Sequence, residues 1–293
     1  MSGARTTVVI GTRNRAEILL RTIERLRTLE PQPPIIVVDD DSHDDTIERL
    51  HALRLDVAQL RVIRMPNDVP AVALNLGADV ARTPFVAFCA DEVSWAPDAL
   101  RKAEAIFDAH ERLGLITANV LDPVSGSPDP LCAELARLPA VPNERLPGPS
   151  VLRFHTGATV LRRSAYLDTG GFDPMLHLAT EEKLLAYDLA AKGWQLCYVD
   201  DVLAYHATSE MAGHRVRSRR LERRDRLVTT WMRRPLRECV RAGVALLRDA
   251  THDGPAALAA LGALRRFGWA MVERELLPAE VEHRIRMDER SAG

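Results

Sequence analysis

The feature that most constrains this chain is an alternation, over its first 120 residues, of short apolar runs with longer segments of helical periodicity. The apolar runs are rich in β-branched residues and span residues 7–10, 35–38, 60–63, 85–88 and 115–117. Such runs, apolar on both faces, are typical of strands inside a parallel sheet. Helical spacing occupies the intervals 15–29, 44–53, 70–81 and 97–112. The alternation predicts an α/β fold with a mostly parallel, doubly wound central sheet.

The pattern changes in the second half of the chain. Seven prolines lie between residues 121 and 149, which predicts a long connection around a short helix at 131–138. Regular patterns then resume as a predicted strand, helix and strand at 157–162, 181–192 and 194–199. Beyond His206 the chain is arginine-rich, and its spacing indicates two or three further helices.

Composition excludes several classes of protein. The 293 residues are 46% hydrophobic and 27% charged, which is too apolar for a disordered chain. A formal charge of −2 argues against phosphate binding over the whole surface, so we expect no nucleic-acid partner. The four cysteines lie far apart without a CxxC pair, which indicates a reduced, cytoplasmic chain. We find no signal-peptide pattern, and no uninterrupted apolar stretch of the ~18–20 residues that a membrane span needs.

Polar and acidic groups follow three of the first four predicted strands. Gly11-Thr12-Arg13-Asn14-Arg15 comes after the first, a run beginning Asp39-Asp40 after the second, and Asp91-Glu92 after the fourth. Any one of these alone would be read as a helix cap or a turn. Because parallel strands bring ligands to their carboxyl ends, the three together predict a binding site at one edge of the sheet.

The ligand at this edge is predicted from what the loops lack and what they contain. The sequence has no GxGxxG after the first strand and no GxxxxGK[ST], so dinucleotide and P-loop sites have no fingerprint here. A diphosphate without a glycine-rich cradle needs a cation to neutralise it. Asp91 and Glu92 offer the carboxylate oxygens that Mg²⁺ or Mn²⁺ takes together with substrate phosphates, which predicts a metal–diphosphate site.

A series of motifs carries a resemblance to a known family. The motifs are TVVIGTRNR at 7–15, VVDDDSHD at 37–44, ALN at 73–75, FVAFCADE at 85–92, PDAL at 97–100, GA at 157–158, RR at 162–163, GGFD at 170–173, EE at 181–182 and YH at 205–206. Their order and spacing, over about residues 5–235, resemble family 2 glycosyltransferases of the GT-A fold.

The resemblance implies an enzyme that moves a hexosyl or deoxyhexosyl group from a nucleoside diphosphate sugar to an acceptor hydroxyl, with inversion at the anomeric carbon and help from Mg²⁺ or Mn²⁺. The residues that it implies for the nucleotide sugar are Gly11, Thr12, Arg13, Arg15, Asp39, Asp40, Asn75, Asp91 and Arg224. It implies Asp91, Glu92 and His206 as metal ligands, although Ala90 and Glu92 stand where the family often has aspartate. Glu182 matches the catalytic base, Glu181 an orienting group beside it, and His155 a weaker candidate on the acceptor side.

The same resemblance divides the chain. It implies a GT-A domain over residues 1–235, with a nucleotide-binding half at about 1–120 and an acceptor-binding half at about 150–210, followed by a C-terminal helical extension at 236–293. Ten arginines fall between 215 and 237. They form a solvated helix face, a lid over the diphosphate, or a patch that meets anionic lipid or a polyanionic acceptor. We expect the acceptor to be a small molecule, a lipid-linked group or a polysaccharide. We expect the chain to be cytoplasmic, with the arginine-rich segment as a candidate peripheral contact to the inner face of the membrane.

Two other functions remain open at this stage. A nucleotidyltransferase on a similar sheet would have a glycine-rich, basic loop after the first strand, but the loop here has one glycine. A non-catalytic binding protein that kept the fold is favoured by Ala90 and opposed by Asp91, Glu92 and Glu182.

Overall fold

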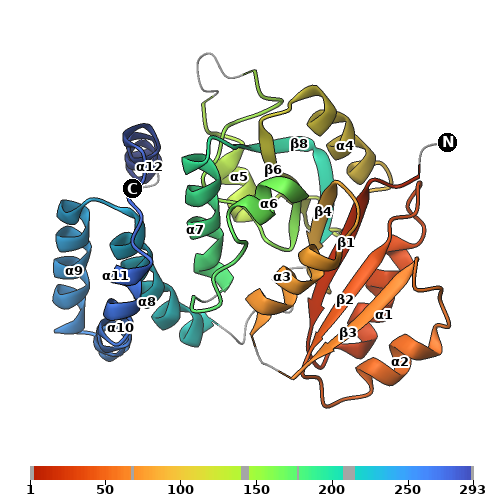
Figure 1. Cartoon of the computed structure of the whole chain (residues 1–293), viewed down its shortest axis with the longest axis horizontal. Coiled ribbons are helices and arrows are strands. Elements are labelled where there is room, and N and C mark those ends of the chain that lie inside the picture. The colour runs from red at the N-terminus through yellow and green to blue at the C-terminus, as the bar shows by residue number, and fades with distance from the viewer. Residues whose placement is uncertain (1–2, 67–68, 140–144, 177, 207–214, 292–293) are drawn as a thin grey trace.

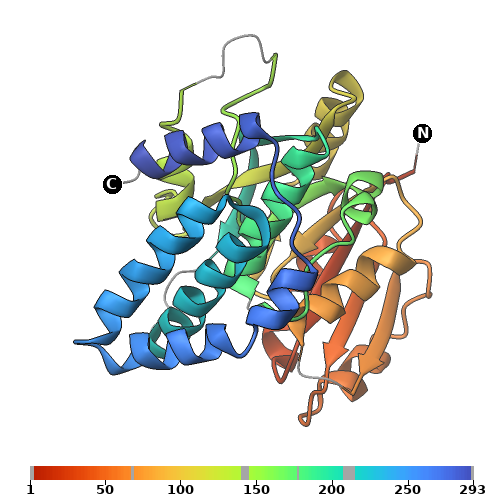
Figure 2. The ribbon, with the colours of Figure 1, turned by 60° about the vertical axis from the view of Figure 1, so that its left-hand side comes forward.

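The computed structural model of the chain describes residues 3–66, 69–139, 145–176, 178–206 and 215–291. An eight-stranded sheet with the order β3-β2-β1-β4-β7-β6-β8-β5 lies at its centre (Figure 1). The strands are β1 Thr6–Thr12, β2 Ile35–Asp40, β3 Leu60–Met65, β4 Phe85–Cys89, β5 Val93–Trp95, β6 Leu113–Leu121, β7 Ala158–Arg162 and β8 Gln195–His206. Helices flank the sheet, and a group of helices from the C-terminal part of the chain lies to one side (Figure 2).

The sheet confirms the predicted α/β fold with a mostly parallel arrangement. Strand β1 is parallel to β2 and β4, β2 to β3, and β6 to β8. Three pairs are antiparallel, because β7 enters between β4 and β6 and the three-residue β5 adds to the edge beside β8. Strand β8 extends to His206, seven residues beyond the predicted end at 199, and so reaches the carboxyl edge of the sheet.

The helices between the strands confirm the predicted alternation. They are α1 Ala16–Leu26, α2 Thr46–Ala52, α3 Pro70–Val80, α4 Ala99–Ala109, α5 Pro130–Leu135, α6 Arg163–Asp168 and α7 Leu178–Ala191. In α1, Leu19, Ile23 and Leu26 are buried at spacings of four and three residues, which places one apolar stripe against the sheet. Pro70 begins α3, where its missing N–H has no partner to lose.

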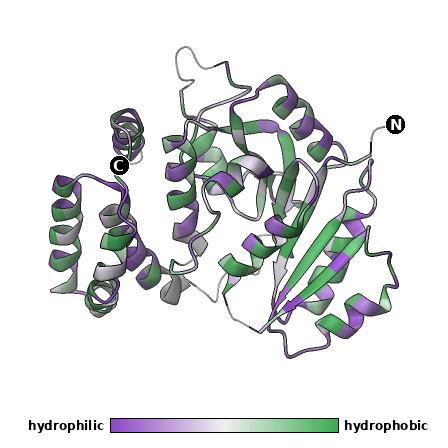
Figure 3. Ribbon diagram, viewed as in Figure 1, coloured by the Kyte–Doolittle hydropathy of each residue, from purple (hydrophilic) through white to green (hydrophobic). Residues whose placement is uncertain are grey.

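The main core lies on both faces of the central strands. All residues of β2 and β4 are buried, as the uninterrupted apolar runs predict for strands covered on both sides. Figure 3 shows the apolar residues along β2 and along its neighbour β3. Phe85 stacks on Phe107 of α4, and Phe88 packs edge-on against Tyr166 of α6. The sheet is therefore a rigid platform for side chains at its carboxyl edge.

The C-terminal helices form a second core. They are α8 Arg215–Arg233, α9 Leu236–Ala250, α10 Gly254–Leu264, α11 Phe267–Val272 and α12 Ala279–Ser291. Val228 and Met232 of α8 pack with Leu246 of α9 and with buried alanines of α10. Helix α8 thus packs with the helices after residue 235, and the domain boundary at 235 stays a prediction. In the described part of the chain, no helix combines the length and the hydropathy needed to cross a bilayer.

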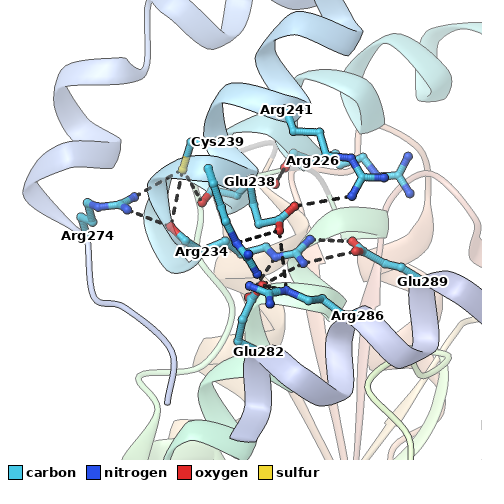
Figure 4. A network of polar contacts seen from close by, with 11 residues as sticks. Arg226, Arg234, Glu238, Cys239, Arg241, Arg274, Glu282, Arg286 and Glu289 are labelled. Carbon is cyan, nitrogen blue, oxygen red and sulfur yellow. Dashed lines mark hydrogen bonds and ion pairs between the residues drawn. The ribbon is translucent and has the colours of Figure 1, made fainter. Parts of the chain in front are cut away.

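Helix α12 joins the C-terminal helices back to the sheet domain. Its Val281 and Ile285 belong to the main core. The guanidinium of Arg234 donates to Glu282 at 3.1 and 3.2 Å and to Glu289 at 2.6 and 3.2 Å (Figure 4). Because Arg234 and Glu282 are both nearly inaccessible, this charged pair lies in the packed junction between the helices.

Candidate active site

A cavity of about 290 Å³ lies at the carboxyl ends of β1, β2 and β4. It is lined by Gly11, Thr12, Arg13, Arg15, Asp40, Pro70, Ala73, Leu74, Phe88, Cys89, Ala90, Asp91, Thr156 and Gly157. The first half of the chain supplies most of this wall, and Thr156-Gly157, just before β7, closes it. The structure therefore brings the predicted polar strand ends together, as parallel strands require.

The loops after β1 and β2 are joined by hydrogen bonds. The backbone N–H of Asn14 donates to Ser42 Oγ at 2.9 Å, and the N–H of His43 donates to Asn14 Oδ1 at 2.7 Å. Asn14 and Asp41 both adopt positive φ, a conformation that Asn and Asp tolerate better than most residues. These contacts fix the loop that carries Arg13 and Arg15. The hydrogen bonds between Asn14 and the second loop were not predicted from the sequence.

Two acids at the end of β4 surround one arginine. Arg15 Nη1 donates to Asp91 Oδ1 at 3.0 Å and to Glu92 Oε2 at 2.7 Å, and Thr12 Oγ1 donates to Asp91 Oδ2 at 3.1 Å. His206 Nε2 lies 3.2 Å from Glu92 Oε1. The structure thus brings together the three residues predicted as metal ligands, with a guanidinium between the two carboxylates.

The pKa values of this cluster follow its contacts. The hydrogen bond from His206, helped by Arg15, lowers the pKa of Glu92 to about 2. The same contact with Glu92 raises the pKa of His206. Burial raises the pKa of Asp91, and the charge of Arg15 opposes this. Burial lowers the pKa of His155, whose ring lies 6.4 Å from that of His206 and which is not among the cavity-lining residues.

The floor of the cavity is a close approach of two backbones. The Ala90 N–H donates to the Gly157 carbonyl at 3.0 Å. A Cβ atom at position 157 would lie 2.7 Å from the Ala90 Cβ, too close for any side chain. Glycine at 157 therefore lets the turn that carries Thr156 approach the end of β4, where the acids lie.

Glu182 lies on α7 and contacts the cavity wall through Thr156. Its Oε1 accepts from the Thr156 N–H at 2.9 Å and from Thr156 Oγ1 at 2.5 Å. Burial raises the pKa of Glu182 to about 7, although these two hydrogen bonds act in the opposite direction. A carboxylate with a pKa near neutral is suited to accept a proton in catalysis. Thr156 is a site residue that sequence reasoning missed, because a hydroxyl beside glycine in a loop has no periodicity.

Glu181 differs sharply from its neighbour. It is 2% exposed, and its Oε2 has no hydrogen-bond partner among the described residues. Burial, together with the charges of Asp173 and Asp225, raises its pKa to about 9. At neutral pH this side chain is a neutral acid below the surface, so the structure separates it chemically from Glu182.

The two aspartates at the end of β2 point to opposite faces of the sheet. Asp40 lines the cavity and accepts from the Val69 N–H at 3.1 Å, at the start of α3. Asp39 is fully buried, accepts from the Ser42 N–H at 3.1 Å, and lies 3.9 Å from Arg64. Its Oδ1 has no hydrogen-bond partner within the part of the chain that the structure describes. The geometry brings Asp40, rather than Asp39, to the cavity.

Asn75 is predicted as a donor-binding residue, but the structure does not bring it to the cavity. Its Nδ2 donates to the Phe172 carbonyl at 2.8 Å, and its Oδ1 accepts from the Phe172 N–H at 2.9 Å and from the Tyr166 hydroxyl. Asn75 thus ties α3 to the turn before α7.

The structure also places Arg224 away from the cavity, where it pairs with Asp225 on α8. Other arginines of the 215–237 segment are held by carboxylates as well. Arg223 pairs with Asp253, Arg233 with Asp188, and Arg234 with Glu282 and Glu289. The pattern that sequence reasoning interpreted as a lid, an anionic patch or a solvated face is, at these positions, a set of contacts between helices. Arginines 215–219 have no described side chains.

Comparison with known sequences assigns the family. The family model for glycosyl transferase family 2 matches residues 7–170, more than half of the chain. The chain belongs to this family. The pre-mycofactocin glycosyltransferases of two strains of Mycobacterium tuberculosis are 30% identical to it over 209 residues, which is 68% of this chain and 42% of theirs. The chain thus spans less than half the length of these curated relatives.

Solved structures agree with the fold. The mannosyltransferase PcManGT of Pyrobaculum calidifontis, solved with GDP-Man and Mn²⁺, superposes with a TM-score of 0.62 at 19% identity, covering 93% of this chain and 84% of that one. Residues 1–349 of S. aureus TarS, solved with UDP-GlcNAc, give a TM-score of 0.58 at 16% identity, covering 90% and 73%. At these identities the likeness shows the GT-A fold.

Proposed function

We propose that this chain transfers a hexosyl or deoxyhexosyl group from a nucleoside diphosphate sugar to an acceptor hydroxyl, with inversion at the anomeric carbon. The observation that carries the proposal is the bond between Glu182 and Thr156 at the wall of a cavity that Asp91 also lines. A general base thereby stands beside a pocket with charged groups for a diphosphate. This is the minimum arrangement for a single displacement.

The reaction balances with one base. The acceptor oxygen attacks the anomeric carbon while Glu182 takes its proton, and the bond from that carbon to the diphosphate oxygen breaks. The acceptor approaches from the side of Glu182, and the diphosphate leaves on the side of Arg15 and Asp91. Because attack and departure occur on opposite faces, the configuration inverts. Glu181, neutral and buried, supports the position of α7 in this scheme.

The donor occupies the cavity. Its walls at Gly11, Thr12 and Arg13 border the nucleotide, and Asp40 accepts a hydrogen bond from an N–H of the base. Pro70, Ala73 and Leu74 offer an apolar surface against which a planar ring packs. The two solved relatives carry a purine and a pyrimidine nucleotide sugar, GDP-Man and UDP-GlcNAc. The donor class follows from the shared diphosphate, and the base and the sugar are left open.

The acids at the end of β4 suit a divalent metal, Mg²⁺ or Mn²⁺. In the described residues no three His, Cys, Asp or Glu side chains form a ready metal site. Mg²⁺ commonly binds through one or two carboxylates plus substrate phosphates, so a complete protein cage is not required. Asp91, Glu92 and His206 have the right donor atoms, and Arg15 already holds positive charge between the carboxylates. The bound metal would neutralise the departing diphosphate; Arg15 and Arg13 do so from the protein side.

The test is a ligand screen followed by product analysis. Nucleoside diphosphate sugars are screened for a rise in Tm, with Mn²⁺ and with EDTA; a donor at about 100 times its Kd stabilises by ~2.7 kcal/mol. We expect one donor to stand out and EDTA to weaken it. NMR of the product should show inversion. Retention of configuration, or stabilisation by no nucleotide sugar, would contradict the proposal.

A further inference from the structure

Helix α9 exposes an apolar stripe along its length. Leu236, Val240, Val244 and Leu247 are each between 58% and 73% exposed. Their spacing of four, four and three residues places them on one face of the helix, while Cys239 and Leu246 are buried against the protein on another. Figure 3 shows apolar and polar residues alternating along this helix.

A row of arginines borders this stripe. Arg237, Arg241 and Arg248 follow the apolar residues by one position in the helical pattern, so they lie along one side of the stripe. Arg237 and Arg241 are 64% and 83% exposed. Glu238 is the acid beside them, and it is shared at 3.4 Å with Arg237, at 3.8 Å with Arg241 and at 3.6 Å with Arg286 (Figure 4). Arg286 also pairs with Glu282 at 2.8 Å, so in the described part of the chain Glu238 is the one carboxylate that the two exposed guanidiniums of Arg237 and Arg241 share, and this side of α9 is positive.

Helix α10 continues the apolar character next to α9. It has no charged residue between Gly254 and Leu264, and Leu258, Leu261 and Leu264 are about half exposed. The two helices pack against each other on the outer side of the molecule, away from the sheet (Figures 1 and 2). Arg265 follows α10 directly.

We infer that the α9 stripe with its arginine row, extended by α10, is a surface that docks on an anionic lipid bilayer. A helix with leucine and valine on one face and arginine beside them lies in the plane of a membrane interface, apolar side chains inserted and cations at the headgroups. A second protein copy would also cover apolar surface, but a row of like charges opposes pairing with itself. The negative leaflet surface supplies the complementary charge.

The proposed membrane contact keeps Arg237 from the predicted 215–237 segment and otherwise lies on α9, beyond that segment. Arg223, Arg224 and Arg233 of α8 are each paired with a carboxylate of their own, whereas Arg237 and Arg241 of α9 share Glu238. It also leaves out Val272 and Leu276, which are exposed but stand beside the exposed Glu273 and Glu275. That pair of apolar residues therefore provides a matched control.

The experiment is co-sedimentation of the full chain with vesicles of phosphatidylcholine alone or with about 30% phosphatidylglycerol, at about 0.1 M salt. We expect binding to the anionic vesicles that weakens at high salt. Each arginine near such a surface contributes about fivefold in partitioning, so R237Q/R241Q should lose about 25-fold. Leu247→Glu should abolish binding, and Val272→Glu should leave it unchanged, with equal Tm in all variants.

Three results would overturn the inference. One is failure of the wild-type chain to bind anionic vesicles. Another is equal binding by Leu247→Glu and the wild type. The third is a dimer, by light scattering, that Leu247→Glu converts to a monomer, since the face would then be an interface between copies. A loss of lipid binding leaves donor binding untouched, so this test and the donor screen fail independently.

Discussion

The sheet domain and the C-terminal helices handle the same kinds of side chain in opposite ways. In the sheet domain, β1, β2 and β4 bury their apolar residues, and charged groups gather around one cavity. In the C-terminal helices, charged groups pair across helix junctions, and apolar residues face outward. Of the fifteen large hydrophobic side chains that are exposed in the described residues, eleven lie between Leu236 and Met287.

This difference shows where each region stores its specificity. A cavity with acids and a base held by backbone contacts binds one class of small molecule. A helix pair with an apolar stripe and a row of cations binds an extended surface. The following variants test this difference: those around the cavity should change catalysis or donor binding, and those at buried charged groups outside it should change stability.

The largest effect is expected at Glu182. Glu182→Gln keeps the size of the side chain but cannot take a proton, so turnover should fall by ~10²–10⁴-fold while donor affinity stays within a factor of about two. Steady-state kinetics and donor titration measure both. Glu17→Gln, at an exposed acid of α1, is the control. If Glu182→Gln lost donor binding instead, Glu182 would be a structural residue.

The same residue predicts a pH dependence. With a pKa of about 7, Glu182 is protonated below neutral pH and cannot act as a base, so kcat/KM should fall as the pH drops through about 7. Thr156→Val removes the hydroxyl that stabilises the carboxylate, so the midpoint should move to higher pH. An unchanged midpoint would show that the Thr156 hydroxyl does not affect the pKa of the catalytic base.

A smaller effect, on stability alone, is expected in the helices. Arg234→Ala leaves the buried Glu282 with Arg286 as its remaining cation, so the free energy of unfolding should fall by about 1.5–3 kcal/mol, as expected for the loss of hydrogen bonds between charged groups. Urea denaturation measures this. Arg241→Ala, at an 83% exposed side chain, should change it by under about 0.5 kcal/mol. Equal effects of the two variants would show that burial does not set the strength of these pairs.

The nucleotide contact should give a comparable but more local loss. Asp40→Ala should weaken donor binding by ~1.5–3 kcal/mol, as expected for a hydrogen bond to a charged group. Asp39→Ala should affect binding less, because Asp39 does not line the cavity. Calorimetry with the donor found in the screen decides between them. A larger loss of donor affinity at Asp39 would indicate that the nucleotide base binds on the other face of the sheet.

The last effect is a gain in stability at Glu181, opposite in sign to the losses above. Its folded pKa of about 9 exceeds the usual 4.5, so the unfolded chain releases this proton first and stability falls as the pH rises between these values. Glu181→Gln removes that loss. Since each pH unit between 4.5 and 8 costs the wild type about 1.4 kcal/mol, the variant should be more stable at pH 8 by up to about 5 kcal/mol, and at pH 4 the two should be nearly equal. Urea denaturation at both pH values measures this. A stability difference that is the same at pH 4 and pH 8 would contradict the raised pKa of Glu181.

Sequence reasoning reached the sheet and missed its non-periodic parts. Strands buried on both faces leave continuous apolar runs, so β1 to β4 and their helices could be predicted. Strand β5 has only three residues, and no local sequence pattern indicates that β7 inserts between β4 and β6. The position of β5 and the antiparallel pairs could therefore not be predicted. Asp91 and Glu92 were predicted from their place at the end of a strand, and Glu182 through a family motif.

The remaining misses concern partners that are distant in sequence. Thr156 matters because Glu182, 26 residues away, bonds to it, and only the fold creates that contact. The arginines of α8 form one run in the sequence, yet Asp188, Asp253 and Glu282 lie far along the chain. A charge run shows how many cations there are, but not which of them already have anions.

The return of α12 to the main core has a consequence for reach. Because Val281 and Ile285 pack into the sheet domain and Arg234 pairs with the same helix, the described C-terminal helices that would rest on lipid are held against the sheet domain at α12. The fold would then fix the distance between a bilayer docked on α9 and the cavity. An acceptor hydroxyl presented from the bilayer would be glycosylated only if its spacer matched that distance, so the length of the spacer, and not its affinity for the cavity, would select among acceptors of similar chemistry.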